Sequence, residues 1–279
     1  PKDTYTAKDI TVLEGLEPVR KRPGMYIGST DEKGLHHLVI EIFDNSLDEA
    51  IAGFAKNILV LLHTDGGVSI SDDGRGIPTD MHPSGVSALE LAMTKLHAGG
   101  KFNTSAYQAS GGLHGVGASA VNALSTHMQG IVKRENKFFI QSYKIGNPDF
   151  AVKEISKAEA RAVLPAFHHD FLEQSSGTYT LFHPDPNIFK KTTEFDFSFI
   201  KRAIRERAFL VAKTFMKLRD DRTGKSVNFY FESGIKSLLA HNNRHKKTLH
   251  EPIPIEGTFT EGPYPVGVEV VMQYTDSFT

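Results

Sequence analysis

Apolar and polar positions along the chain alternate between helical and strand-like spacing. Residues 35–52 carry apolar side chains at helical spacing, broken by a few polar positions, and predict one long helix. Residues 58–63 and 68–71 flank an Asp-Gly-Gly turn and predict a β-hairpin buried on one face. Further helices are expected over 87–97, 118–124 and 157–164.

The C-terminal half shows the same alternation. We expect one or two strands over 130–145, a strand over 178–183 and a helix over 197–216. Strands over 227–231 and 266–274 are separated by the polar, proline-containing stretch 242–265. A turn cluster at 220–224 precedes them. We therefore place a domain boundary near residue 220, which gives a domain over 1–220 and a second, shorter one over 221–279.

Composition narrows the class of protein. The length of 279 residues gives a prior of about two domains. Hydrophobic residues make up 39% and charged residues 23%, and no apolar run approaches the length of a membrane span. The absence of cysteine excludes disulfides, thiolate metal sites and cysteine nucleophiles and suits a reducing compartment. We expect a cytoplasmic protein with no membrane contact.

Positive charge is concentrated in residues 201–225. Across the whole chain 32 Lys+Arg stand against 33 Asp+Glu, so any affinity for nucleic acid has to arise from local asymmetry. Residues 201–225 contain nine basic and three acidic side chains, which leaves +6. Two interpretations stay open: a solvated helix face, or a surface that faces phosphates.

Polar side chains interrupt the apolar pattern of the long predicted helix at Glu41, Asn45 and Asp48. Residues four apart share one helix face, so Glu41 and Asn45 project together. A carboxylate can activate water, and an amide oxygen is a hard donor suited to Mg²⁺. The alternative is an ordinary polar outer face.

A second constellation, Asp72-Asp73-Gly74-Arg75-Gly76-Ile77-Pro78, falls where the second hairpin strand ends. A carboxylate there can accept a hydrogen bond from an exocyclic amine, while the glycines permit close approach of a ligand. Adenine fits this description. A plain Asp-Gly turn is the alternative, although such a turn seldom needs the Arg-Gly-Ile-Pro that follows.

A third constellation, residues 111–117, closes a long glycine-rich loop that has no apolar period and is typical of functional or disordered segments. It leads directly into a predicted helix, and backbone N–H groups at such a junction can bind phosphates. Its spacing differs from the dinucleotide fingerprint and from the P-loop, so both of those site types are excluded. A flexible linker is the alternative.

Together and in this order, the three constellations resemble the N, G1 and G2 boxes of the GHKL ATPases. Residues 20–28, 34–37, 96–102 and 111–117 narrow the resemblance to the ATPase subunits of bacterial type IIA DNA topoisomerases, the gyrase and topoisomerase IV B subunits. The resemblance implies an α/β fold: an α+β sandwich of the GHKL (Bergerat) type. It has a mixed, largely antiparallel sheet with helices on one face, followed by the start of a transducer domain over 221–279 that resembles ribosomal S5 domain 2.

The resemblance also implies the role of individual residues. Glu41 matches the general base, Asn45 the Mg²⁺ ligand and Asp72 the carboxylate that binds adenine, with Thr178 sharing its water network. The other residues implied to contact ATP are Tyr5, Asp48, Glu49, Arg75, Gly76, Ile77, Pro78, Lys101, Tyr107, Gly112, Leu113, His114, Gly115, Val116, Gly117 and Arg134.

Partners follow from the same resemblance. The N-terminal arm, residues 1–15, is expected to reach a second copy of the subunit when ATP binds and to bring Tyr5 to its nucleotide. An A-type topoisomerase subunit and double-stranded DNA are expected in the full assembly, with DNA strand passage and supercoiling as the activity. The family's γ-phosphate lysine is expected beyond Thr279. Two other readings are a sensor histidine kinase, disfavoured by residues 20–28, and an ATP-gated clamp without meaningful hydrolysis.

Overall fold

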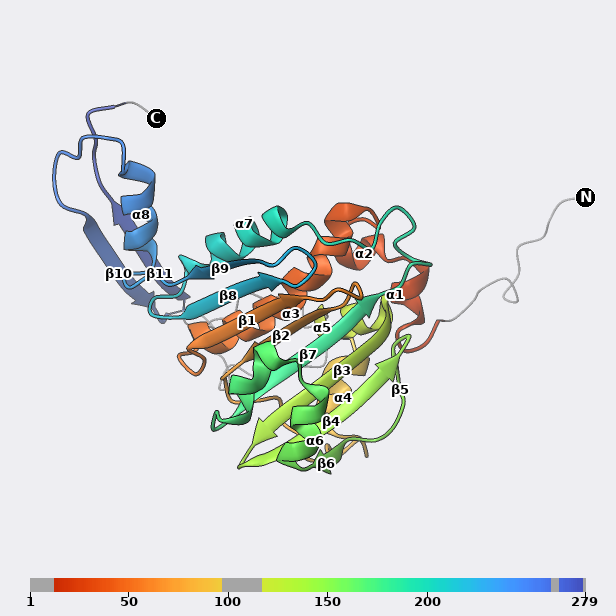
Figure 1. Cartoon of the computed structure of the whole chain (residues 1–279). Coiled ribbons are helices and arrows are strands. Elements are labelled where there is room, and N and C mark those ends of the chain that lie inside the picture. The colour runs from red at the N-terminus through yellow and green to blue at the C-terminus, as the bar shows by residue number, and fades with distance from the viewer. Residues whose placement is uncertain (1–12, 97–116, 262–265, 278–279) are drawn as a thin grey trace, which may run out of the picture.

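The computed structural model describes residues 13–96, 117–261 and 266–277. Its core is a nine-stranded sheet with the order β5-β4-β3-β7-β2-β1-β8-β9, in which β6 pairs with β4 (Figure 1). The strands of this sheet are β1 Asn57–Leu62, β2 Val68–Asp72, β3 Ser125–Arg134, β4 Lys137–Lys144, β5 Asn147–Pro148, β6 Lys153–Ile155, β7 Gly177–Pro184, β8 Phe215–Asp220 and β9 Lys225–Phe229. A separate hairpin pairs β10 Ile253–Phe259 with β11 Val266–Met272.

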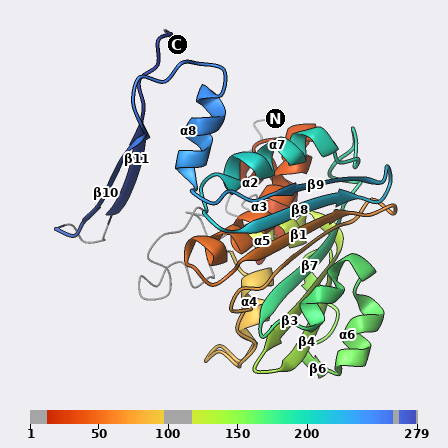
Figure 2. The ribbon, with the colours of Figure 1, turned by 60° about the vertical axis from the view of Figure 1, so that its left-hand side comes forward.

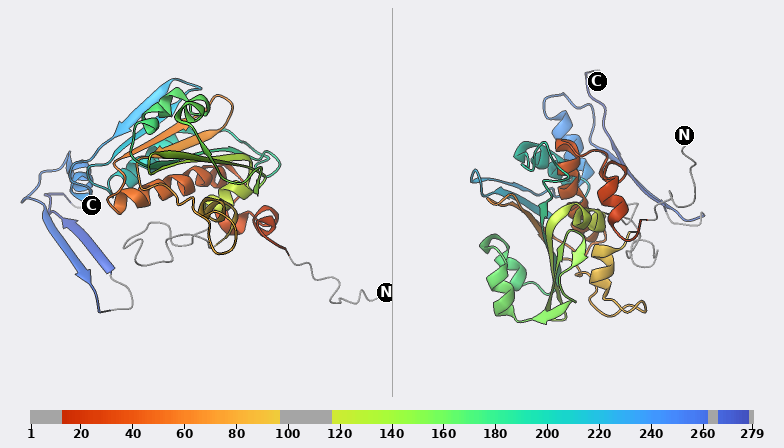
Figure 3. Two further views of the ribbon diagram at one scale, coloured as in Figure 1. Left: turned by 90° about the horizontal axis from the view of Figure 1, so that it is seen from below. Right: turned by 90° about the vertical axis from the view of Figure 1, so that its right-hand side faces the viewer.

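Helices lie on both faces of the sheet (Figure 3). They are α1 Glu17–Lys21, α2 Gly24–Ile27, α3 Glu32–Ile51, α4 Ala88–Thr94, α5 Gly117–Ala123, α6 Lys157–Val163, the 3₁₀ helix η3 Ala166–Leu172, α7 Phe197–Ala208 and α8 Ile235–Asn243. No helix within the described ranges combines the length and the apolar character needed to cross a bilayer.

Pairing in the main sheet is antiparallel everywhere except between β1 and β8, which run parallel with Val60 opposite Leu218. The expected mixed, largely antiparallel sheet is therefore confirmed. The hairpin of β1 and β2 also forms as expected, with Leu62 opposite Val68.

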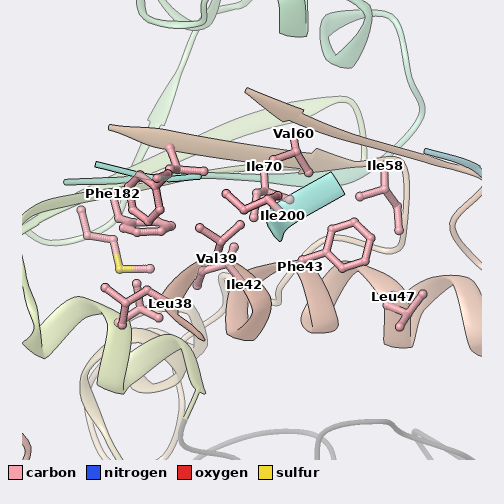
Figure 4. Packing of buried hydrophobic residues seen from close by; sticks show 14 of the residues in the cluster. Leu38, Val39, Ile42, Phe43, Leu47, Ile58, Val60, Ile70, Phe182 and Ile200 are labelled. Atoms are coloured by element: carbon pink, nitrogen blue, oxygen red, sulfur yellow. The ribbon is translucent and has the colours of Figure 1, made fainter. Parts of the chain in front are cut away.

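The main core lies between α3 and the sheet. The α3 N-cap is Asp31, whose side chain accepts from the Lys33 backbone N–H, and the helix then runs for 20 residues. Its apolar face points Val39, Ile42 and Phe43 at strand residues such as Val60 and Ile70 (Figure 4). Burying one such side chain contributes roughly 1.5–3 kcal/mol, so this contact fixes α3, and its polar residues, against the sheet.

The opposite face of the sheet is covered as well, which corrects two expectations. Helices were expected on one face only, but α6 and η3 pack a second cluster, including Phe171 and Tyr179, against the other face. The hairpin was expected to be buried on one face, yet every residue of β2 is buried. The serines of β2 that point away from α3 meet His168 of η3: Ser69 Oγ lies 2.8 Å from its Nε2 and Ser71 Oγ 2.8 Å from its Nδ1.

The C-terminal third departs most from expectation. The helix expected over 197–216 ends at Ala208, and Met216 belongs to β8. The boundary expected near 220 falls inside the β8–β9 hairpin, which continues the main sheet, so we propose that the domain boundary follows Phe229 instead. The polar stretch 242–265, for which no element was predicted, contains β10, and α8 was not predicted either. Figure 2 shows α8 and the β10–β11 hairpin standing apart from the main sheet.

Candidate functional site

The candidate site is built on one end of the sheet, where β2 ends and β7 begins. Asp72 is the last residue of β2 and pairs with Thr178 of β7, while α3 lies across the same end. This arrangement brings together residues that are far apart in the sequence. The Ile77 backbone N–H donates to Thr178 Oγ1 at 3.3 Å, and the guanidinium of Arg134, at the end of β3, donates to the Gly76 carbonyl at 2.8 Å.

Asp72 is a deeply buried carboxylate of this site. Its residue is 5% exposed, and its carboxylate accepts from Ser46 Oγ at 2.7 Å and from the Gly74 backbone N–H at 3.0 Å. Burial raises the pKa of Asp72 to about 6, against the opposing effect of these two donors. Because two donors leave part of the carboxylate's acceptor capacity unused, Asp72 can still accept from a ligand.

Gly76 adopts a backbone conformation that favours glycine at this position after Asp72. Its φ of +74° is a conformation that side chains disfavour, and a Cβ there would lie 2.8 Å from the Lys133 carbonyl oxygen. The chain therefore turns tightly against the ends of β3 and β7. This turn places Ile77, which is partly buried, and Pro78, which is exposed, on the rim of the site.

Arg75 is clamped at this rim. Its backbone N–H and Nε both donate to Glu49 Oε2 at 3.0 Å, its Nη2 donates to Glu49 Oε1 at 2.8 Å, and its guanidinium lies 4.0 Å from the ring centre of Phe54. The bidentate pair fixes the plane of the guanidinium, which gives the rim a flat, rigid surface.

A second group of polar residues lies further back along α3. Glu41 and Asn45 are half-buried and stand one turn apart, as expected, and Asp48 follows on the same face, fully buried. His37 Nε2 lies 2.8 Å from Glu41 Oε1. The hydrogen bond to Glu41 raises the pKa of His37 above its usual value, so the pair favours a histidine that donates to the carboxylate.

The other oxygen of Glu41 faces the start of α5. A Cβ at Gly117 would overlap Glu41 Oε2, so any larger residue there would force the Glu41 carboxylate to move. Gly117 is the one residue of the expected phosphate loop inside the described ranges. The remaining expected contacts on that loop and on the arm, Tyr5, Lys101, Tyr107 and residues 112–116, lie outside the described residues.

Sequence reasoning gave no role in the site to three residues that contact its members: His37, Ser46 and Ser176, whose Oγ donates to the Gly74 carbonyl at 2.7 Å. Spacing offers a signal for His37, which stands four residues before Glu41 on the same helix. Ser46 and Ser176 meet their partners only through tertiary packing, so nothing local in the sequence marks them.

The sequence and the fold match a known class of ATPase. Residues 30–153 match the family described as "Histidine kinase-, DNA gyrase B-, and HSP90-like ATPase". Within that class the chain is similar over nearly its whole length to the ATPase region of type IIA DNA topoisomerase B subunits, as the following relatives show.

The chain is 48% identical over 275 residues to the B subunit of DNA gyrase from Archaeoglobus fulgidus and 47% identical over 279 residues to that from Treponema pallidum. These matches cover 98% and 99% of this chain and 41% of each relative, so the chain spans about two-fifths of the length of these proteins. A crystal structure of the 43K ATPase domain of Thermus thermophilus gyrase B in complex with an aminocoumarin matches with a TM-score of 0.77 at 36% identity. That match covers 95% of this chain and 63% of the crystallised one.

Proposed function

We propose that the chain binds ATP at this site and forms the ATP-hydrolysing region of a type IIA topoisomerase B subunit, gyrase rather than topoisomerase IV. The observation that carries the proposal is the buried Asp72 carboxylate, which keeps acceptor capacity beside a glycine turn that allows close approach. Asp72 accepts from the exocyclic amine of adenine, Thr178 assists it, and the clamped Arg75 lies beside the base.

The residues along α3 suit a Mg²⁺ ion that travels with the triphosphate. No three His, Asp or Glu side chains within the described ranges converge so as to bind a metal by themselves. Mg²⁺ is commonly bound by one or two protein oxygens together with substrate phosphates, and the Asn45 amide oxygen, next to Glu41, is such a donor. When bound, the ion neutralises phosphate charge and orients the γ-phosphate.

Glu41 supplies the general base. Its Oε1 is held by His37, so Oε2, which faces the start of α5, is the oxygen that takes the proton from water. The water then attacks the γ-phosphorus in line with the departing oxygen of ADP. His37 acts as a positioning residue because its hydrogen bond fixes the carboxylate plane.

The presence of this base favours hydrolysis over an ATP-gated clamp that does not turn over. In the larger assembly we propose that ATP brings two copies together through the arm, residues 1–15, which carries Tyr5 to the partner's nucleotide. An A-type subunit and double-stranded DNA complete the assembly, which supercoils DNA by strand passage. The genomes of bacteria and archaea lie in the cytoplasm, where we place it.

A paired measurement tests the proposal. We expect Glu41→Gln to bind a non-hydrolysable ATP analogue within about threefold of the parent, by calorimetry, and to release phosphate about 10²- to 10⁴-fold more slowly, because a general base contributes that much. Glu251→Gln, at an exposed position in the C-terminal unit, is the matched control and should change neither value. If a parent chain extended to include the expected γ-phosphate lysine binds the analogue but releases no phosphate, the clamp is the correct function; if the chain does not bind the analogue at all, the site assignment fails.

A further inference from the structure

A second candidate site lies between α7 and the edge strand β9. It is a groove of about 700 Å³. Phe199, Val227 and Phe229 form an apolar floor, and Lys201, Arg202 and Arg205 on α7 form a cationic wall. None of these residues takes part in the nucleotide chemistry proposed above.

The cations of the wall differ from neighbouring arginines in having no ion-pair partner among the described residues. Arg207, Arg219 and Arg222 are each paired with an aspartate, at 2.5, 2.6 and 2.9 Å. Within the described residues no carboxylate lies at ion-pair distance from the three side chains of the wall, all of which are exposed. These three exposed cations therefore give the groove a local positive charge.

The groove borders an open sheet edge. The β9 strand is the last strand of the main sheet, has five residues and contains no proline. The opposite edge is blunted, since β5 has two residues and ends in Pro148, and β6 has three. Of the two edges of the main sheet, as far as the structure describes it, only β9 therefore offers a strand of ordinary length to an added chain.

We propose that this groove binds an extended acidic segment of a partner protein, which adds as a strand to β9. Alternate side chains of such a strand lie on the α7 side of the sheet. There apolar side chains meet Val227 and Phe229, which are two residues apart, and acidic side chains reach the three cations of the wall. Main-chain hydrogen bonds give affinity, and the charges select an acidic sequence.

The charge of the groove favours a peptide over nucleic acid. Glu32 and Asp196 line one end of it, so the groove is cationic over only part of its length. A nucleic acid carries negative charge at every nucleotide, whereas a peptide can place acidic residues against the wall and neutral ones beside Glu32. The floor, moreover, is suited to aliphatic and aromatic side chains.

The experiment is a titration of the isotope-labelled protein with a synthetic heptapeptide, acetyl-Glu-Thr-Val-Thr-Phe-Thr-Glu-amide, followed by amide NMR shifts. We expect shifts confined to α7 and to 225–229 and slower hydrogen exchange along β9. Arg202→Glu/Arg205→Glu should raise the dissociation constant about tenfold or more, as should glutamine in place of glutamate in the peptide. Arg161→Glu, an exposed charge reversal on α6, should leave it within about twofold.

Folding of the variants is checked by retained binding of the ATP analogue, and Arg202→Gln/Arg205→Gln provides a milder pair with a smaller effect in the same direction. Amide shifts outside the groove would overturn the proposal. A dissociation constant that is unchanged by Arg202→Glu/Arg205→Glu would also overturn it. So would tighter binding of a single-stranded oligothymidylate at the same residues, which would make the groove a nucleic-acid site. Self-association that depends on Arg202 and Arg205 would assign the groove to a second copy.

Discussion

At the scale of single residues, the burial of Asp72 and its expected ligand favour opposite protonation states of the carboxyl group. Burial favours the neutral acid, whereas hydrogen bonding to an adenine amine is strongest for the anion. A folded-state pKa of about 6, above the usual 3.8, means that the contribution of Asp72 to stability is complete below pH 3.8 and is lost as the pH rises through 6. At neutral pH the protein therefore retains a group that weakens its fold, which is expected of a functional site.

The variant Asp72→Asn separates the effect of this carboxylate on ligand binding from its effect on stability. We expect it to weaken analogue binding about 10- to 100-fold at pH 7.5, because an acceptor beside the base becomes partly a donor. It should raise the free energy of unfolding at pH 7 by on the order of 1–3 kcal/mol, a gain that vanishes below pH 4. Calorimetry and denaturant melts across pH 4–8 measure both, and parent affinity should itself decline below pH 6. A pH-independent parent affinity would argue against Asp72 as the base-binding carboxylate.

Gly117 provides a second test at this scale. Gly117→Ala would set a Cβ against Glu41 Oε2, so we expect phosphate release to fall at least about tenfold as the carboxylate is displaced. Gly130→Ala is the control, since its nearest neighbour would be Leu89 Cδ1 at 3.6 Å, an ordinary contact. In the double variant with Glu41→Ala, the stability cost of Gly117→Ala should shrink because the clash is gone. Additive costs would contradict the contact.

Part of the grouping of residues at the candidate site was predictable because these residues lie in short, dense motifs. The spacing of Glu41 and Asn45 on one helix face and the glycines after Asp72 express local geometry that the sequence carries directly. Ser46 and Ser176 could not be predicted because each meets its partner only once α3, β2 and β7 are packed together.

At the scale of elements, Arg20 ties α1 to the helix that begins at the site. Its guanidinium donates to the carbonyl of Ala123, the last residue of α5, and to the buried Asp185 carboxylate, both at 2.6 Å. Burial opposes ionisation of Asp185, but hydrogen bonds from Arg20 and Asn187 outweigh it and hold its pKa below the usual range.

Arg20→Ala would leave that carboxylate buried without its cation, and we expect a loss of about 2–4 kcal/mol at pH 7 in denaturant melts. Because the folded pKa of Asp185 is depressed, this contribution is present above the ordinary aspartate pKa and fades as the pH falls below it. Lys137→Ala removes an ion pair to Glu154 in which both side chains are about half exposed, and should cost under about 1 kcal/mol. If Arg20→Ala and Lys137→Ala lost the same free energy of unfolding, the burial of Asp185 would not be the cause of the effect of Arg20→Ala.

Helices and strands were predictable where one hydrophobic period persists along the sequence. They were not predictable where pairing with a distant strand decides the local structure. The long helix at α3 and the first hairpin keep a clean pattern. Residues 209–216 continue the apolar spacing of α7, yet β8 forms because Met216 and Leu218 face the core while Lys217 and Arg219 point the other way beside β1. That pairing partner is more than 150 residues away, so local spacing does not reveal it.

At the scale of the whole molecule, the sheet and the C-terminal hairpin differ in how they are held. Every residue of β10 is exposed, and an isolated two-stranded hairpin is marginal in water. We expect a chain ending at Ser233 to keep its analogue affinity and to melt within a few degrees of the parent, by circular dichroism. A chain ending at Thr214 should not fold, because it loses β8 and β9 and uncovers β1. A shorter chain that still melted cooperatively would mean that β8 is dispensable.

The parallel pairing of β1 with β8 has a consequence for synthesis on the ribosome. Leu62 ends β1 and Phe215 begins β8, so 152 residues must emerge before β1 gains its second neighbour. At about 5–20 residues per second this takes roughly 8–30 s. For that time the nascent chain displays an apolar strand with an unpaired edge, which makes it a natural client for ribosome-associated chaperones.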